Sequence, residues 1–244
     1  MPEAGAVTRA LLGVAPGGSD GRALAEQVCR ACVAGLDVGG AGISVLTGSP
    51  ARATLWASDA TAQRLEDLQF SLGEGACMQA AATGSPVRVP DLREGTEVAR
   101  WPIFAAAVAE QTDARALFAL PLQWGVTNLG VLDLYRSTPG GLSPAQWADA
   151  LSAADLAAFR LLDLRTDPGN RENLGEAPLW RNSPAPGGRS EIHQATGMVL
   201  EQLAITPAEA LARLRAHAFV QQRPLIDVAR DVVARRTVFT EEMR

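Results

Sequence analysis

Three cysteines are the most reactive side chains in the sequence, and two of them, Cys29 and Cys32, are separated by two residues. The Cys-x-x-Cys spacing occurs in redox pairs and in tetrahedral zinc sites. In a helix it places both thiols on one face, but the sequence has no second Cys-x-x-Cys and no histidine nearby to complete a metal site. We therefore expect Cys29 and Cys32 to be buried as small apolar side chains, and we predict no metal site.

Cys77 follows the glycine-rich segment Gly73–Ala76 and precedes a run of good helix formers. A thiol at the start of a helix can have a lowered pKa, because the positive end of the helix stabilises the thiolate. This position makes Cys77 a candidate redox sensor, an idea that thiol labelling of the folded protein tests. The odd, low number of cysteines argues against a disulfide framework and favours a reducing compartment.

All 22 basic residues are arginine, whose planar guanidinium suits bidentate contacts with phosphate or base edges. Residues 1–188 carry 14 arginines and 20 acidic residues, a net charge of −6, whereas residues 189–244 carry 8 arginines and 7 acidic residues, a net of +1. The acidic N-terminal part is a poor binder of polyanions. The C-terminal part permits nucleic-acid binding, but its charge alone does not require it.

Catalytic motifs are missing from the sequence. Glu74 and Asp133 are carboxylates whose spacing does not support catalysis, and no zinc-protease, phosphate-loop, serine-hydrolase or kinase pattern occurs. No histidine lies between residues 21 and 164, which disfavours a histidine-ligated haem. We predict a protein that is not an enzyme and has no cofactor.

The first 19 residues lack the basic start and the long apolar run of a signal peptide. We expect residues 1–19 to form a flexible N-terminus. No window is apolar enough to span a membrane, so we expect a cytoplasmic protein.

The 244 residues, 47% of them hydrophobic, are enough for about two domains. Residues 20–164 alternate between helical periodicity and short β-like runs, which predicts an antiparallel sheet with helices packed on it, an α+β domain. The expected helices are Gly21–Leu36, Thr61–Phe70, Gly73–Thr83, Trp101–Glu110 and Ser143–Leu164. The expected strands are Gly42–Thr47, Ala53–Ser58, Val87–Val89, Ala114–Leu122 and Leu129–Tyr135.

Residues 165–188 are rich in proline and glycine and read as a linker. Helical periodicity then returns three times, over Glu191–Leu203, Thr206–Val220 and Leu225–Arg236. The second of these segments begins with Thr206, Pro207 and Glu209, a capping box with proline at the first helical position. Short connections predict an all-α three-helix bundle over residues 189–240.

The N-terminal domain resembles a GAF domain. The resemblance lies in the segment Gly73–Cys77 with the helix that follows it, in Trp101-Pro102-x-Phe104, and in the paired strands Ala114–Leu122 and Leu129–Tyr135. It implies a sensor domain that binds a small ligand or responds to another signal, and that pairs through its terminal helices.

The C-terminal bundle resembles an ANTAR domain. The matching features, in order, are Gln194-Ala195-x-Gly197-Met198, Ala210, Leu214-Arg215, Ala218, Arg223, Leu225 and Val228-Ala229. ANTAR proteins are similar in being transcription antiterminators that bind paired stem-loops in nascent RNA. Many members have a lysine where this chain has Thr196, so any phosphate contact of that lysine is absent here.

The resemblance makes Gln194, Gly197, Met198, Arg215 and Arg223 the candidate RNA-binding residues. Gln194 is expected on the exposed side of its helix. The two arginines are the best phosphate contacts, although surface arginines of helices are more often only solvated. Gly197 costs about 1 kcal/mol in mid-helix relative to alanine, which favours close packing against another helix slightly over close approach of RNA.

We therefore expect a GAF-like sensor that controls dimerisation and an ANTAR-like bundle that binds RNA as an antiterminator. Two stem-loops imply two bundles and hence a homodimer, with Gly21–Leu36 and Ser143–Leu164 as the expected contacts. Two other functions stay open. The bundle could bind DNA in the manner of a helix-turn-helix, or it could be a protein-interaction module.

Overall fold

The computed structural model describes residues 5–13, 20–46, 52–166 and 189–240. The chain divides into two compact units, an N-terminal unit and one that contains the C-terminal helices, and each is described by itself. The predicted linker 165–188 lies outside the described residues from position 167 onward.

The N-terminal unit is built on a five-stranded sheet with strand order β2-β1-β5-β4-β3. Its central pairs, β1 with β5, β5 with β4 and β4 with β3, are antiparallel. The predicted α+β class with an antiparallel sheet is confirmed. The strands are β1 Gly40–Leu46, β2 Arg52–Ala57, β3 Val87–Val89, β4 Ala116–Trp124 and β5 Thr127–Arg136.

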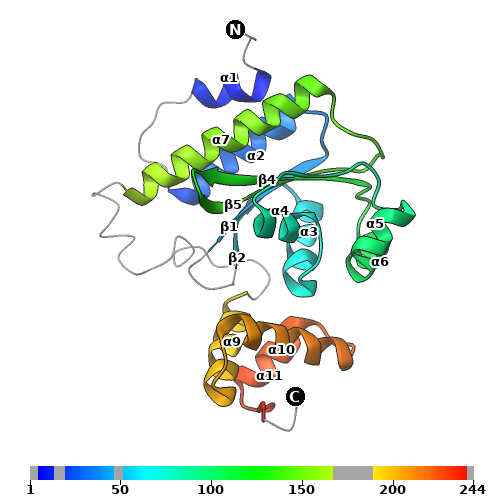
Figure 1. The fold of residues 1–244 in the computed structure, drawn as a ribbon, viewed down its shortest axis with the longest axis vertical. Coiled ribbons are helices and arrows are strands. Elements are labelled where there is room, and N and C mark those ends of the chain that lie inside the picture. The colour runs from blue at the N-terminus through cyan, green and yellow to red at the C-terminus, as the bar shows by residue number, and fades with distance from the viewer. Residues whose placement is uncertain (1–4, 14–19, 47–51, 167–188, 241–244) are drawn as a thin grey trace. The chain divides into compact units, whose positions relative to one another are not determined.

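Helices cover both faces of this sheet (Figure 1). One face carries α1, α2 and α7, and the other carries α3 and α4, with α6 packed against α3 and α5 against α6. The helices are α1 Ala6–Leu12, α2 Gly21–Gly35, α3 Ala60–Leu72, α4 Ala76–Thr83, α5 Gly95–Arg100, α6 Pro102–Gln111 and α7 Pro144–Thr166.

Strand β4 is buried along Ala116–Leu122 without alternation, as expected of a strand with both faces covered. On one side α7 packs against β4, and Phe118 meets Trp147 of that helix edge to face. On the other side α4 packs against the same strand. The nearly unbroken apolar run therefore places β4 at the centre of the domain.

Side-chain caps define where several helices start. Asp20 accepts the N–H of Ala23 at 2.7 Å, and Asp59 accepts the N–H of Ala62 at 2.8 Å. Ser143 and Gln146 form a reciprocal pair of side-chain to backbone hydrogen bonds at the start of α7. These caps satisfy backbone donors that the first turn of a helix leaves without partners.

The prediction of a flexible N-terminus is wrong for residues 6–12, which form α1. The buried carboxylate of Asp149 on α7 accepts the N–H groups of Val7 at 2.9 Å and Thr8 at 3.0 Å, and the hydroxyl of Thr8 at 2.6 Å. Asp149 thus caps α1 from another helix, about 140 residues away in sequence. Because the helix is short and its cap is not local, periodicity within the first 19 residues could not reveal it.

The opposite end of α1 is held by α7 as well. Arg160 donates to the carbonyl oxygen of Leu11 at 2.7 Å, so an anion meets the N-terminus of α1 and a cation its C-terminus. Both charges complement the helix dipole. Val7 and Leu11 are buried between these contacts, and α1 therefore belongs to the packed domain.

The C-terminal unit contains three helices, α9 Arg189–Leu203, α10 Pro207–Val220 and α11 Leu225–Val233. Helix α9 packs against both α10 and α11. The predicted capping box at Thr206 and Glu209 is present, and the predicted helical bundle is confirmed. Helix α11 ends at Val233, earlier than the predicted Arg236, because Arg235 adopts a left-handed conformation with φ of 56°.

Replacing Asp149 by alanine is expected to detach α1 from the domain. The change removes three hydrogen bonds to the start of the helix, and the loss of a cap costs roughly 0.5–2 kcal/mol. The measurements are the free energy of unfolding by urea and the rate of proteolysis within residues 1–20. Asp155→Ala, an exposed carboxylate of the same helix, is the matched control and should leave both unchanged. Equal proteolysis of the two variants would contradict the role of Asp149.

Candidate functional site

One face of α9 buries Ile192, Ala195 and Val199 in the bundle. The opposite face is left outside by the periodicity of the helix, and its residues, which start at position 194, follow the spacing i, i+3, i+4, i+7 and i+8. Together with two residues that follow α11, this face forms an open groove. Its lining residues are Gln194, Gly197, Met198, Glu201, Gln202, Arg235 and Val238.

Three of the five predicted RNA-binding residues, Gln194, Gly197 and Met198, meet in this groove. Gln194 is exposed, as expected from the sequence. The preference for close packing at Gly197 is wrong. Apart from the neighbouring backbone of α9 itself, no atom of the described residues lies within 4 Å of the place where a Cβ would stand. The missing side chain instead leaves the floor of the groove open.

The wall of the groove opposite α9 is held by the segment after α11. The amide N–H of Phe239 donates to Oε1 of Gln202 at 2.9 Å. The ring of Phe239 is buried and contacts His217 of α10, with ring centroids 5.1 Å apart. These contacts fix the segment and leave its neighbour Val238 half exposed beside Met198 and Gln194 in the groove lining.

Left-handed residues end each helix of the bundle. Ala204, Gln222 and Arg235 have φ of 51°, 51° and 56°. In each case the next residue donates its N–H to a carbonyl five positions earlier, as Arg223 does to Ala218 at 3.0 Å. This is the Schellman motif, and at α11 it directs Arg235 to the groove.

Predicted residue Arg223 lies outside the groove lining but is linked through Asp231 to Arg236, the neighbour of the lining residue Arg235. Its guanidinium donates to Asp231 at 2.8 Å, and Asp231 also accepts from Arg236, the neighbour of Arg235. The hydrogen bonds from Arg223 and then Arg236 lower the pKa of the Asp231 carboxyl. Arg223 and Arg236 thus share the carboxylate of Asp231, and the net charge of these three side chains stays positive.

Predicted residue Arg215 is placed differently from the other four. It is half buried in α10, and burial lowers the pKa of its guanidinium to about 10. The side chain stays protonated at neutral pH, but it offers less surface to a phosphate than Arg223 or Arg235 does.

Sequence reasoning missed the contribution of Arg235 and Val238 to the groove. In the sequence Arg235 and Arg236 form only a two-residue basic patch, which is a weak signal of nucleic-acid binding. The position of Arg235 and Val238 opposite α9 depends on the left-handed turn at Arg235 and on the hydrogen bond from Phe239 to Gln202. No local sequence pattern indicates either of them.

The cysteines of the N-terminal domain are all buried. Burial raises the pKa of the Cys29 thiol well above its ordinary value, and raises that of Cys32 to about 12, as suits the predicted apolar role. Cys77 is fully buried, and its amide N–H donates to Oε1 of Gln69. A thiol closed off from solvent does not suit the predicted redox sensor.

The two sequence motifs of the N-terminal domain meet in space. Gly73 and Gly75 have φ of 70° and 115°, a left-handed backbone that favours glycine. The turn between them aims the carboxylate of Glu74 at the start of α6, where it accepts the N–H of Phe104 at 3.0 Å. Glu74 is therefore a structural link between the motifs.

The chain thus combines an α+β domain, built on an antiparallel five-stranded sheet with helices on both faces, with a helical domain that has an exposed groove on its first helix. The family model for the GAF domain matches residues 19–161, and that for the ANTAR domain matches residues 185–233. The chain belongs to the GAF domain family and carries an ANTAR domain after the GAF domain. This arrangement is regulatory in kind.

A solved structure supports the fold of the N-terminal domain, and a second is reported beside it as a similar protein. The GAF domain of a phosphoenolpyruvate-protein phosphotransferase from Coxiella burnetii is 12% identical, with a TM-score of 0.51 over 65% of this chain and 92% of that chain. The corresponding domain from Acinetobacter is 10% identical, with a TM-score of 0.48 over 65% of this chain and 90% of that chain. No curated protein matches the chain. Within its described part, no helix is both long and apolar enough to cross a membrane.

Replacing Gln222 by glycine is expected to stabilise the C-terminal bundle. Glycine adopts a left-handed φ without the strain that a Cβ brings, which is worth up to roughly 1 kcal/mol. Gln221→Gly is the matched control, because Gln221 has a right-handed φ of −82° and glycine there should only destabilise. Thermal unfolding of the bundle measures both effects. A lower stability for Gln222→Gly than for the unchanged protein would contradict the proposed strain.

Proposed function

We propose that this protein is a transcription antitermination regulator whose ANTAR domain binds paired stem-loops of nascent RNA through the groove on α9. The observation that carries the proposal is the meeting of Gln194, Gly197 and Met198 with Arg235 in that groove. The GAF domain supplies the input, a small ligand or another signal, and controls the pairing of two chains.

The chemistry of the groove suits the loop of an RNA hairpin. Unstacked bases in loops are recognised by side chains that stack on them or hydrogen-bond to their edges. Gln194 offers an amide for base edges, Met198 and Val238 offer apolar contact, and Arg235 offers a guanidinium for phosphate or base. Gly197 lets the backbone of a ligand approach α9 closely.

The charges around the groove indicate how a bound RNA would be oriented in it. Arg235 lies in the lining, with Arg236 and Arg223 next to it around Asp231. Glu201 lies in the same lining and repels phosphate. We therefore place the RNA backbone on the side of the arginines and the bases toward α9.

Binding of two stem-loops requires two bundles, and we propose that a homodimer supplies them. Helices α2 and α7 pack side by side on one face of the sheet, and they expose apolar side chains that include Val33 and Phe159. The ring of Phe159 lies against that of Trp124, tilted by 48° with the ring centroids 5.2 Å apart, and both rings are about half exposed. An aromatic pair exposed in this way suits the centre of a protein contact.

Replacing Arg235 by glutamine is expected to weaken binding of a tandem stem-loop RNA. Loss of one phosphate contact should reduce affinity roughly tenfold at low salt and lower the slope of log affinity against log salt by about 1. A mobility shift at several salt concentrations measures both. Glutamine keeps the strain of the left-handed position similar, so the change is mainly in charge.

Arg230→Gln is the matched control for that experiment. Arg230 is an exposed arginine of α11 that pairs with Glu191 and Asp227 and does not line the groove. Its replacement should change RNA affinity little. Equal losses in the two variants would mean that only the net charge of the bundle matters, and tighter binding to duplex DNA than to RNA would contradict the proposed function.

Replacing Phe159 by glutamate is expected to shift the chain from dimer to monomer. A charge in the proposed apolar contact must either lose its water or keep the two chains apart. Sedimentation equilibrium measures the change, with Asp155→Ala on the same helix as the control. A dimer of unchanged strength in Phe159→Glu would remove this face from the proposal.

A further inference from the structure

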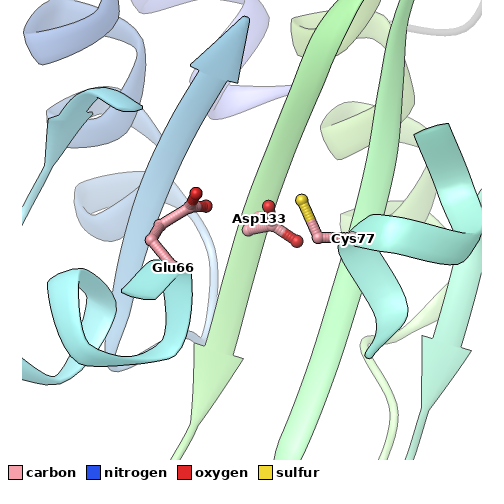
Figure 2. Close-up of side chains that lie close together, drawn as sticks. All are labelled: Glu66, Cys77 and Asp133. Atoms are coloured by element: carbon pink, nitrogen blue, oxygen red, sulfur yellow. The ribbon is translucent and has the colours of Figure 1, made fainter. Parts of the chain in front are cut away.

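Three side chains of the GAF domain that can each ligate a metal ion converge in the core. They are Glu66 from α3, Cys77 from α4 and Asp133 from β5, and one ligand atom of each lies within 4.8 Å of the others. Figure 2 shows the carboxylates and the thiol turned toward one another, with Asp133 between the other two. The three residues are far apart in sequence, so only the fold brings them together.

The turn between α3 and α4 fixes two of the three groups. Glu66 and Gln69 lie one helical turn apart on α3, and both are buried. The left-handed residues Gly73 and Gly75 reverse the chain after α3, and Gln69 then accepts the N–H of Cys77 at 2.8 Å. This hydrogen bond holds the start of α4, and with it the thiol, next to Glu66.

Glu66 is the strongest indication of a missing partner. Its side chain is 3% exposed, its Oε2 accepts only a long hydrogen bond of 3.3 Å from Thr54, and its Oε1 has no hydrogen-bond partner among the described residues. Burial of a carboxylate is costly unless hydrogen bonds and an opposite charge compensate it. A second carboxylate within 4.8 Å increases that cost.

A glycine of β1 lets the carboxylate of Glu66 lie close to the sheet. Gly42 of β1 pairs with Asp133 across the sheet, and a Cβ at Gly42 would stand 3.3 Å from Oε1 of Glu66. A cavity of about 10 Å³ is lined by Gly42, Gln69, Asp133 and Tyr135 together with four apolar residues, and of the three proposed ligands Asp133 is the one in its lining. That volume suits about one water molecule.

We propose that Glu66, Cys77 and Asp133 bind one divalent transition-metal ion in the core of the GAF domain. A thiolate with two carboxylates suits an ion such as Zn²⁺ or Fe²⁺, because thiolate ligands disfavour Mg²⁺ and Ca²⁺. Metal to ligand distances of about 2.0–2.3 Å place the ligand atoms of a tetrahedral ion roughly 3.3–3.8 Å apart. The three groups, which lie within 4.8 Å of one another, therefore close in when the ion binds. The thiol releases its proton to solvent when Cys77 binds the ion.

Three protein ligands leave one position of a tetrahedral ion open, and the cavity beside Asp133 has room for about one water molecule to fill it. This role deepens the proposed function, on which it rests, because it names the ion itself as the input of the sensor. Binding of the ion can be measured without RNA, so failure of this inference and failure of the RNA-binding proposal are distinguishable.

The test uses the full chain, stripped with a chelator and titrated with Zn²⁺, Co²⁺ and Mg²⁺. We expect one Zn²⁺ or Co²⁺ per chain, a thiolate charge-transfer band with Co²⁺, and a rise in the melting temperature of the GAF domain with Zn²⁺ but not with Mg²⁺. Cys77→Ala should abolish the band. Cys32→Ala, which removes another buried thiol of the same domain, should keep it.

Glu66→Gln and Asp133→Asn test the carboxylates with almost no change of shape. Each should weaken binding of Zn²⁺ at least about tenfold, while the metal-free variant folds at least as well as the metal-free protein because one buried charge is gone. Circular dichroism of the metal-free variants checks the fold. Absence of Zn²⁺ and Co²⁺ binding in the unchanged protein, or binding that survives all three ligand substitutions, would overturn the inference.

Discussion

The pairing of β4 with β5 is the constraint on which the N-terminal domain depends. The two strands are joined by a turn at Gly125, which has φ of 58°, and they pair from Ala116 with Arg136 to Trp124 with Thr127. On the far side of β5, Gly130 lets β1 approach so closely that a Cβ there would stand 2.2 Å from the carbonyl oxygen of Ser44. The register set by these strands decides which face each side chain joins, and a slip by one residue would turn Asp133 away from the cluster with Glu66 and Cys77.

The bundle depends on a different constraint, the ends of its helices. Periodicity alone would allow each helix to continue, but a left-handed residue stops each one and turns the chain back. None of these residues is glycine, so each turn is retained at some cost in backbone strain. At α11 that strain coincides with the residue that contributes a cation to the groove. Strained backbone often accompanies functional positions, and Arg235 fits that relation.

Much of the fold could be predicted from the sequence because its signals are local. The caps at Ser143 and Thr206, the apolar run of β4 and the three helical stripes after residue 189 each follow from residues within one or two turns of each other. The short helix α5 was missed, since six residues carry little periodicity. The helix α1 was missed because its N-terminal cap, Asp149, comes from α7.

The candidate sites also divide into residues that local spacing can group and residues that only the tertiary fold brings together. Gln194, Gly197 and Met198 share one face of one helix, so spacing could group them before their surroundings were known. Arg235 joins them only through a turn and a tertiary hydrogen bond, and the burial of Arg215 depends on how α10 packs. The cluster of Glu66, Cys77 and Asp133 draws on two helices and a strand, and no spacing in the sequence indicates it.

The attachment of α1 to α7 affects which residues a fragment must include for the GAF domain to fold completely. The family match starts at residue 19, which would be a natural place to cut the gene when the domain is produced alone. A chain shortened there would lack the three hydrogen-bond donors that Val7 and Thr8 give to Asp149, and the surface that Val7 and Leu11 cover would be open to water. A fragment intended for expression or crystallisation should therefore include α1 together with its N-cap Gly5.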